Sequence, residues 1–181
     1  MVHAMDVAGG NPGRSAHALA LAAARAVEHA RTQVSAFLGV ADPRDLAFVP
    51  GCTYGLNLVL KGTLKRGDRV VVSSVEHNAV ARPLAYLATS GVKVARVPAD
   101  AQGRIDLDDI ERAVAAAPTR MVVCQHASNV TGAIQPIGDI VDIAHEHGAV
   151  VVVDGAQAAG HLPLALGMLG ADAYVAPGHK G

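Results

Sequence analysis

The sequence predicts an α/β fold in which a mainly parallel sheet carries helices on both faces. Three observations lead to this prediction. Short apolar runs rich in valine and alanine recur along the chain. Segments with helical periodicity separate these runs, and glycine, proline and aspartate lie at many of the junctions. Strands that alternate with helices are typical of a parallel sheet buried on both sides.

The N-terminal part of the chain is expected to form an irregular segment, a long helix and a first strand. Residues 1–14 are rich in glycine and proline and are expected to be irregular. Ser15 is expected to cap an alanine-rich helix that runs to about Leu38 and ends at Gly39. At helical spacing, one apolar face holds Leu19, Ala23, Ala26, Val27, Ala30 and Val34. A short strand over 46–49 and a helix over 53–60 are expected to follow.

From residue 69 onward, strands and helices are expected to alternate. The expected strands cover 69–73, 92–97, 120–124, 149–153 and 171–176. The expected helices cover 79–89, 107–116 and 136–147, with prolines near two of their starts and acidic residues in the first turn of the second. Because no repeat or linker interrupts this order, a single domain over residues 1–181 is expected.

Composition argues against several classes of function. The formal net charge is −1 and charged residues make up 17% of the chain, which gives no basis for binding nucleic acid or an anionic membrane. No apolar run approaches the roughly 20 residues needed to span a bilayer. Cys52 and Cys124 are too few for a disulfide framework, and the N-terminus lacks the features of a signal peptide. A cytoplasmic location is therefore expected. No zinc motif, dinucleotide fingerprint or P-loop is present.

Polar residues follow the expected strands at their carboxyl ends, the edge where parallel sheets bind ligands. Asp154 closes one strand, and Lys180 follows the next. A carboxylate and an amine in these places are what a pyridoxal 5′-phosphate site requires, because the carboxylate keeps the pyridine nitrogen protonated and the amine forms a Schiff base. Taken alone, Asp154 could equally cap the next helix, and Lys180 could be a solvated lysine.

Other strand ends supply further binding groups. Cys52 and Thr53 begin a helix, where free N–H groups and a hydroxyl suit a phosphate dianion; an ordinary threonine cap is the alternative. His77 has a planar ring that could lie over an aromatic cofactor and exchange protons at a substrate, or else make a local loop hydrogen bond. Asn129 and Gln157 could hold a ring hydroxyl, although turn residues of this kind are common.

Together these residues resemble the class V aminotransferase family of fold type I pyridoxal-phosphate enzymes, and within it the cysteine desulfurase / selenocysteine lyase branch. The likeness rests on Val-Asp-Gly-Ala-Gln-Ala over 153–158 and on Gly-His-Lys over 178–180. Segments 51–57, 75–79 and 128–132 support it. The resemblance implies the large domain of a fold type I enzyme, truncated after the Schiff-base lysine.

The resemblance also implies a role for each candidate residue. Lys180 would form the Schiff base and move the α proton, Asp154 would pair with the pyridine nitrogen, and His77 would stack on the ring. The other candidates would serve the ring hydroxyl or the phosphate: Gln157, Asn129, Cys52, Thr53 and His179. Family members often have serine or threonine before Gly-His-Lys, whereas this chain has Pro177. Phosphate binding is therefore expected to depend more on Thr53, His179 and the backbone.

The implied activity is removal of sulfur from L-cysteine, which yields alanine and an enzyme persulfide. A cysteine-like amino acid is the implied substrate, the expected assembly is a homodimer, and a sulfur-acceptor protein is a further candidate partner. Two alternatives remain open: another α-carbon reaction of the family, such as transamination, racemisation or selenocysteine lysis, and a non-catalytic partner subunit. The persulfide cysteine and the carboxylate-binding arginine of the family match no residue here. The isolated chain is therefore expected to bind the cofactor without turnover.

Overall fold

The computed structural model describes residues 2–14 and 17–180. The chain divides into two compact units, Met1–Ala47 and Phe48–Gly181. Among the described helices, none is long and apolar enough to cross a membrane.

The first unit contains helix α1 (Val2–Val7), helix α2 (Ala18–Leu38) and the short 3₁₀ helix η1 (Pro43–Asp45). The expectation of an irregular segment over 1–14 is therefore wrong for α1. The predicted cap Ser15 lies outside the described residues, and α2 is instead capped by His17, whose Nδ1 accepts a hydrogen bond from Ala20 N at 3.2 Å. Gly39 ends α2 as predicted, at a φ of 67° that favours glycine.

The strand predicted over 46–49 does not form. Asp42 caps η1 by accepting a hydrogen bond from Arg44 N at 2.9 Å, so the chain turns immediately before this segment. The side chain of Arg31 donates to the carbonyl of Leu46. This bond ties the start of the segment to α2, and no described strand pairs with it.

The apolar face predicted for α2 is mostly exposed. Ala23 is the one member of the predicted set that is buried, and the buried residues of the helix are Ala20, Ala23 and Ser35. Within the described part of its own unit, α2 packs against two short elements, α1 and η1. Periodicity identifies an apolar face, but it does not determine whether that face has a neighbour.

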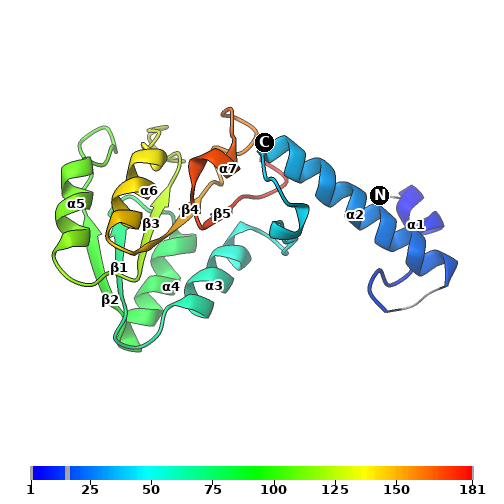
Figure 1. Ribbon diagram of the computed structural model, residues 1–181, viewed down its shortest axis with the longest axis horizontal. Helices are drawn as coiled ribbons and strands as arrows, with labels where there is room; N and C mark the ends of the chain where they lie inside the picture. Colours follow the sequence, from blue (N-terminus) through cyan, green and yellow to red (C-terminus); the bar gives the residue numbers. More distant parts are fainter. Residues whose placement is uncertain (1, 15–16, 181) are drawn as a thin grey trace. The chain divides into compact units, whose positions relative to one another are not determined.

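The second unit confirms the predicted fold. Five parallel strands form a sheet in the order β2-β1-β3-β4-β5. The strands are β1 (Arg69–Ser73), β2 (Lys93–Val97), β3 (Met121–Gln125), β4 (Val150–Asp154) and β5 (Ala173–Val175). The helices are α3 (Cys52–Thr63), α4 (Asn78–Thr89), α5 (Leu107–Ala115), α6 (Ile137–Glu146) and the unpredicted short α7 (Leu166–Leu169). In Figure 1, α3 and α4 lie on one side of the sheet, and α5 and α6 lie on the other.

Two apolar cores, one on each face of the sheet, decide which way the strand-end residues point. One core joins the sheet to α3 and α4 and includes Val123 and Val152, while the other joins it to α5 and α6 and includes Val153. Successive side chains of a strand point to opposite faces. Gln125 and Asp154, two residues beyond Val123 and Val152, therefore point toward α3 and α4. These two residues are also neighbours in the β3–β4 register.

Two glycines allow close approach between the elements that surround Asp154. A Cβ on Gly155 would lie 1.9 Å from Cε1 of Tyr174, so the chain after β4 passes directly against this ring. A Cβ on Gly55 would lie 2.7 Å from Cγ1 of Val175, so α3 packs closely on β5. The first approach joins the chain after β4 to β5, and the second joins α3 to β5, so β5 links α3 to the end of β4.

Candidate functional site

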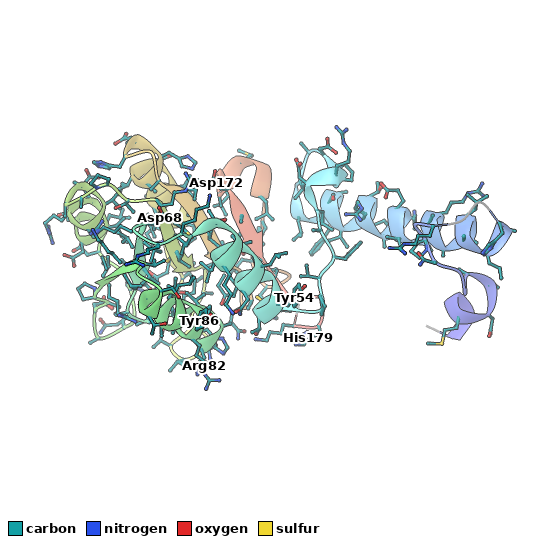
Figure 2. The ribbon with its side chains drawn as sticks, turned by 90° about the horizontal axis from the view of Figure 1, so that it is seen from below. Tyr54, Asp68, Arg82, Tyr86, Asp172 and His179 are labelled. Atoms are coloured by element: carbon teal, nitrogen blue, oxygen red, sulfur yellow. The ribbon has the colours of Figure 1, made fainter. Side chains whose placement is uncertain are left out.

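A cavity of about 790 Å³ lies at the carboxyl ends of the strands, beside the N-terminal ends of α3 and α4. Figure 2 shows two of its lining residues, Tyr54 and His179, at the same end of the second unit. The structure brings all eight residues that the sequence suggested into the lining of this one cavity: Cys52, Thr53, His77, Asn129, Asp154, Gln157, His179 and Lys180.

Asp154 is a buried carboxylate with one oxygen left for a ligand. Asp154 is 3% exposed. Oδ1 accepts hydrogen bonds from Ala156 N at 3.0 Å and from Cys52 Sγ at 3.5 Å. Within the described part of the chain, Oδ2 accepts none. The turn-capping role and the binding role considered for Asp154 are therefore compatible, because they use different oxygens.

The thiol of Cys52 contacts Asp154. It lies 3.5 Å from Asp154 Oδ1 and 3.5 Å from the carbonyl oxygen of Val175. Burial, followed by the negative charge of Asp154, raises the pKa of Cys52 to about 12. The thiol therefore stays protonated at neutral pH and donates to its neighbours. Only the backbone N–H of Cys52, at the start of α3, is left for a phosphate.

Lys180 and Asp154 act on the same thiol from within the cavity. The positive charge of Lys180 lowers the pKa of Cys52, against the larger effects of burial and Asp154. Lys180 itself is exposed, and its backbone carbonyl lies 2.7 Å from Nε2 of His161. Lys180 and Asp154 also line the same cavity, so one bound molecule could meet both the amine and the carboxylate.

The N-terminal end of α3 is suited to an anion. Gly51 precedes the helix, and no described side chain caps it. The N–H groups of the first turn therefore remain for a ligand, and the helix dipole places partial positive charge there. Thr53 is exposed within this turn and its carbonyl accepts a hydrogen bond from Asn57 Nδ2 at 2.9 Å. Thr53 is not the helix cap, so that alternative reading is wrong.

His77 caps α4 and also lines the cavity. Its Nδ1 accepts a hydrogen bond from Ala79 N at 3.1 Å. When the ring is neutral, its proton is therefore on Nε2, and the side chain offers a donor rather than a base. The local hydrogen bond considered for His77 is therefore present, and it leaves the ring in the cavity wall.

Among the described lining residues, three with polar side chains were not among the predicted site residues: Tyr54, Asn57 and Gln125. Gln125 could have been found from strand parity, because it shares a face with Met121 and Val123. Asn57 lies four residues after Thr53 on α3, so helix spacing could have found it. Helix spacing does not point to Tyr54, which follows Thr53 directly. Among the described residues, no group of three or more histidine, cysteine, aspartate or glutamate side chains could hold a metal ion.

The model of the family described as "Aminotransferase class-V" matches residues 1–181. A "Probable cysteine desulfurase" of Halalkalibacterium halodurans is 33% identical over 175 residues, which cover 94% of this chain and 43% of that protein. A "Cysteine desulfurase" of Synechococcus elongatus is 38% identical over 172 residues, which cover 92% of this chain and 27% of that protein. The chain thus spans less than half the length of these relatives.

Solved structures agree with these sequence matches. The apo structure of cysteine desulfurase from Thermococcus onnurineus superposes with a TM-score of 0.87 at 34% identity, covering 99% of this chain and 46% of that one. The structure titled "SspA in complex with cysteine" superposes with a TM-score of 0.86 at 29% identity, covering 96% of this chain and 50% of that one.

Proposed function

The chain belongs to the aminotransferase class-V family, and we propose that its cavity binds pyridoxal 5′-phosphate for a desulfurase-like reaction on L-cysteine. The family match confirms the resemblance inferred from the sequence. One observation carries the proposal: a buried carboxylate, an uncapped helix N-terminus and a lysine amine line the same cavity. These are the groups that the ring nitrogen, the phosphate and the carbonyl of this cofactor need.

The residues fit the cofactor group by group. Asp154 Oδ2 would hold the proton of the ring nitrogen, and Lys180 would hold the carbonyl carbon covalently. The start of α3, Thr53 and His179 would bind the phosphate. Gln157 and Asn129 would bind the ring hydroxyl, and His77 would face the ring with Nε2–H as a donor. When bound, the cofactor supplies an electron sink for a bond that breaks at the substrate α carbon.

We propose a cysteine-like amino acid as substrate, a homodimer as the assembly of the whole protein, and a sulfur-acceptor protein as a further partner. The names of the relatives support the substrate class, as does the cysteine named with one structural neighbour. Large apolar side chains on α2 and on the α3–α4 face support self-association, because they are exposed: Leu19, Leu21, Phe37, Tyr54, Leu58 and Tyr86.

The phosphate part of the proposal predicts that pyridoxal 5′-phosphate binds about 10- to 100-fold more tightly than pyridoxal, because charge-assisted hydrogen bonds at the start of α3 are lost without the phosphate. Absorbance titrations of the 181-residue chain with each compound measure the two affinities. Thr53→Val is expected to weaken pyridoxal phosphate more than pyridoxal. Equal affinities for both compounds would show that α3 does not receive the phosphate.

We expect the 181-residue chain to release no sulfide from cysteine, even with the cofactor bound. The thiol of Cys52 stays protonated because its pKa is about 12, and the pKa of the fully buried Cys124 is raised by burial and by Glu76. Neither cysteine therefore offers a thiolate to take the sulfur. A sulfide assay with cysteine and excess reductant checks this. Sulfide release that is lost in Cys52→Ala would contradict it.

A further inference from the structure

A glutamate behind the cavity wall makes contacts that the proposed reaction does not use. Glu76 lies between β1 and α4, immediately before His77. Its Oε1 accepts a hydrogen bond from the backbone N of Gln125 at 2.9 Å and another from the hydroxyl of Ser73. The residue is partly exposed, but its Oε2 is buried and has no partner among the described residues.

Glu76 joins two neighbouring strands at the point where their ladder stops. The β1–β3 register ends at the pair Val72 and Val123. Beyond it, the carboxyl group of Glu76 takes the N–H of Gln125, and the side-chain amide of Gln125 donates to the carbonyl oxygen of Val75 at 2.8 Å. Two side-chain bonds thus replace backbone pairing at the sheet edge where the cavity lies.

Both strand ends that Glu76 joins carry residues of the cavity wall. His77 follows it directly, and the ring of His77 is held by its bond to Ala79 N. Gln125 lines the cavity and is the register neighbour of Asp154. A shift of Glu76 would therefore move two lining residues, His77 at the start of α4 and Gln125 at the end of β3.

We propose that Glu76 is a positioning residue of the cofactor site, which fixes His77 and Gln125 in the cavity wall by joining the ends of β1 and β3. The identity of the ligand at this site rests on the proposed function. The hydrogen bonds by which Glu76 joins β1 and β3 do not depend on it. Glu76 is not among the described residues that line the cavity, so it acts through its neighbours.

The joint is expected to depend on pH. Burial raises the pKa of Glu76 to about 7, the bonds from Ser73 and Gln125 oppose this rise, and the charge of Asp154 adds to it. The titratable groups that face Glu76 are Asp154 on β4 and the buried thiol of Cys124 on β3, with His77 next in the chain. The folded-state pKa is higher than the ordinary value of 4.5, so the folded chain holds this proton more tightly. Its contribution to stability is therefore present at low pH and is lost as the pH rises through about 7.

The test uses amide resonances of the ¹⁵N-labelled 181-residue chain without cofactor. In the wild type, the Gln125 amide proton is expected to titrate with a midpoint near the pKa of Glu76. In Glu76→Gln this titration disappears while the Ala79 and Gln125 amides keep their positions, because the amide oxygen still accepts both bonds. In Glu76→Ala both resonances are expected to move. The matched control is Glu146→Gln, an exposed glutamate at the end of α6, which should change neither.

Denaturant unfolding and cofactor titration complete the experiment. Between about pH 5 and pH 9, the unfolding equilibrium constant of the wild type is expected to rise on the order of 100-fold more than that of Glu76→Gln. Glu76→Ala is expected to bind pyridoxal phosphate roughly 5- to 10-fold more weakly than Glu76→Gln. A Gln125 amide that does not titrate, or Glu76→Ala resonances that match the wild type, would overturn the inference. If no variant binds the cofactor, the proposed function fails, and the resonances still decide the role of Glu76.

Discussion

Replacing Lys180 with alanine is expected to abolish covalent attachment of pyridoxal phosphate to the chain. Lys180 is the lysine that lines the cavity, and its charge already acts on Cys52 there. Its side chain makes no hydrogen bond or ion pair with the described residues, so its loss should cost little folding free energy. The measurement is the visible absorbance that stays with the protein after excess cofactor is removed.

Two matched variants test whether the effect of Lys180→Ala comes from the amine itself. One keeps the positive charge at position 180, and the other removes a lysine elsewhere in the chain. Lys180→Arg keeps the positive charge but cannot form the bond, so it should also lose the absorbance. Lys93→Ala removes an exposed lysine of edge strand β2 and should keep it. Wild-type absorbance in Lys180→Ala would show that another amine holds the cofactor.

Replacing Asp154 with asparagine is expected to weaken cofactor binding about 10- to 100-fold without reducing the stability of the cofactor-free chain. Asparagine keeps an oxygen for Ala156 N but loses the charge that holds the ring proton. In the free chain, that charge is buried and raises the pKa of three neighbouring groups, those of Cys52, Glu76 and Tyr174. A residue that favours a ligand at some cost in stability is common at functional sites.

The same variant should make Cys52 more reactive. Because Asp154 raises the pKa of the Cys52 thiol, its neutralisation lowers that pKa and increases the thiolate fraction at a given pH. The rate of alkylation by iodoacetamide measures this effect, and denaturant unfolding measures stability. Asp139→Asn, an exposed acidic residue in the first turn of α6, is the matched control.

An Asp154→Asn chain that binds the cofactor with wild-type affinity would show that this carboxylate does not pair with the cofactor.

The sheet could be predicted from the sequence because local signals determine it. The valine-rich runs that became β1 and β4 each bury three consecutive valines, followed by a buried polar residue at the carboxyl end, Ser73 in β1 and Asp154 in β4. The observed strands differ from the predicted ones by at most a few residues. Segment 46–49 has a similar apolar pattern but forms no strand. The 3₁₀ helix η1 turns the chain just before it, and Arg31 donates a hydrogen bond to the carbonyl of Leu46. That outcome depends on the turn before the segment and on Arg31, 15 positions from Leu46, and the apolar pattern of 46–49 contains neither.

The candidate site could be predicted because the carboxyl ends of parallel strands meet at one edge. The side-chain contacts within the site could not be predicted. The contact of Cys52 with Asp154 joins residues 102 positions apart, and that of Glu76 with Gln125 joins residues 49 positions apart. Both depend on which way a side chain turns once the backbone is in place. Strand order and residue type limit such contacts but do not select them.

One measurement tests most directly whether Asp154 and Lys180 share a cofactor. The 181-residue chain is incubated with pyridoxal phosphate, reduced with borohydride, digested, and mapped by peptide mass spectrometry. The account predicts that the label lies on Lys180 in the wild type, at cofactor concentrations too low to label Lys61, Lys65 or Lys93, and that Asp154→Asn needs more cofactor for the same labelling. A label spread evenly over the four sites, or equal labelling of both proteins, would contradict it.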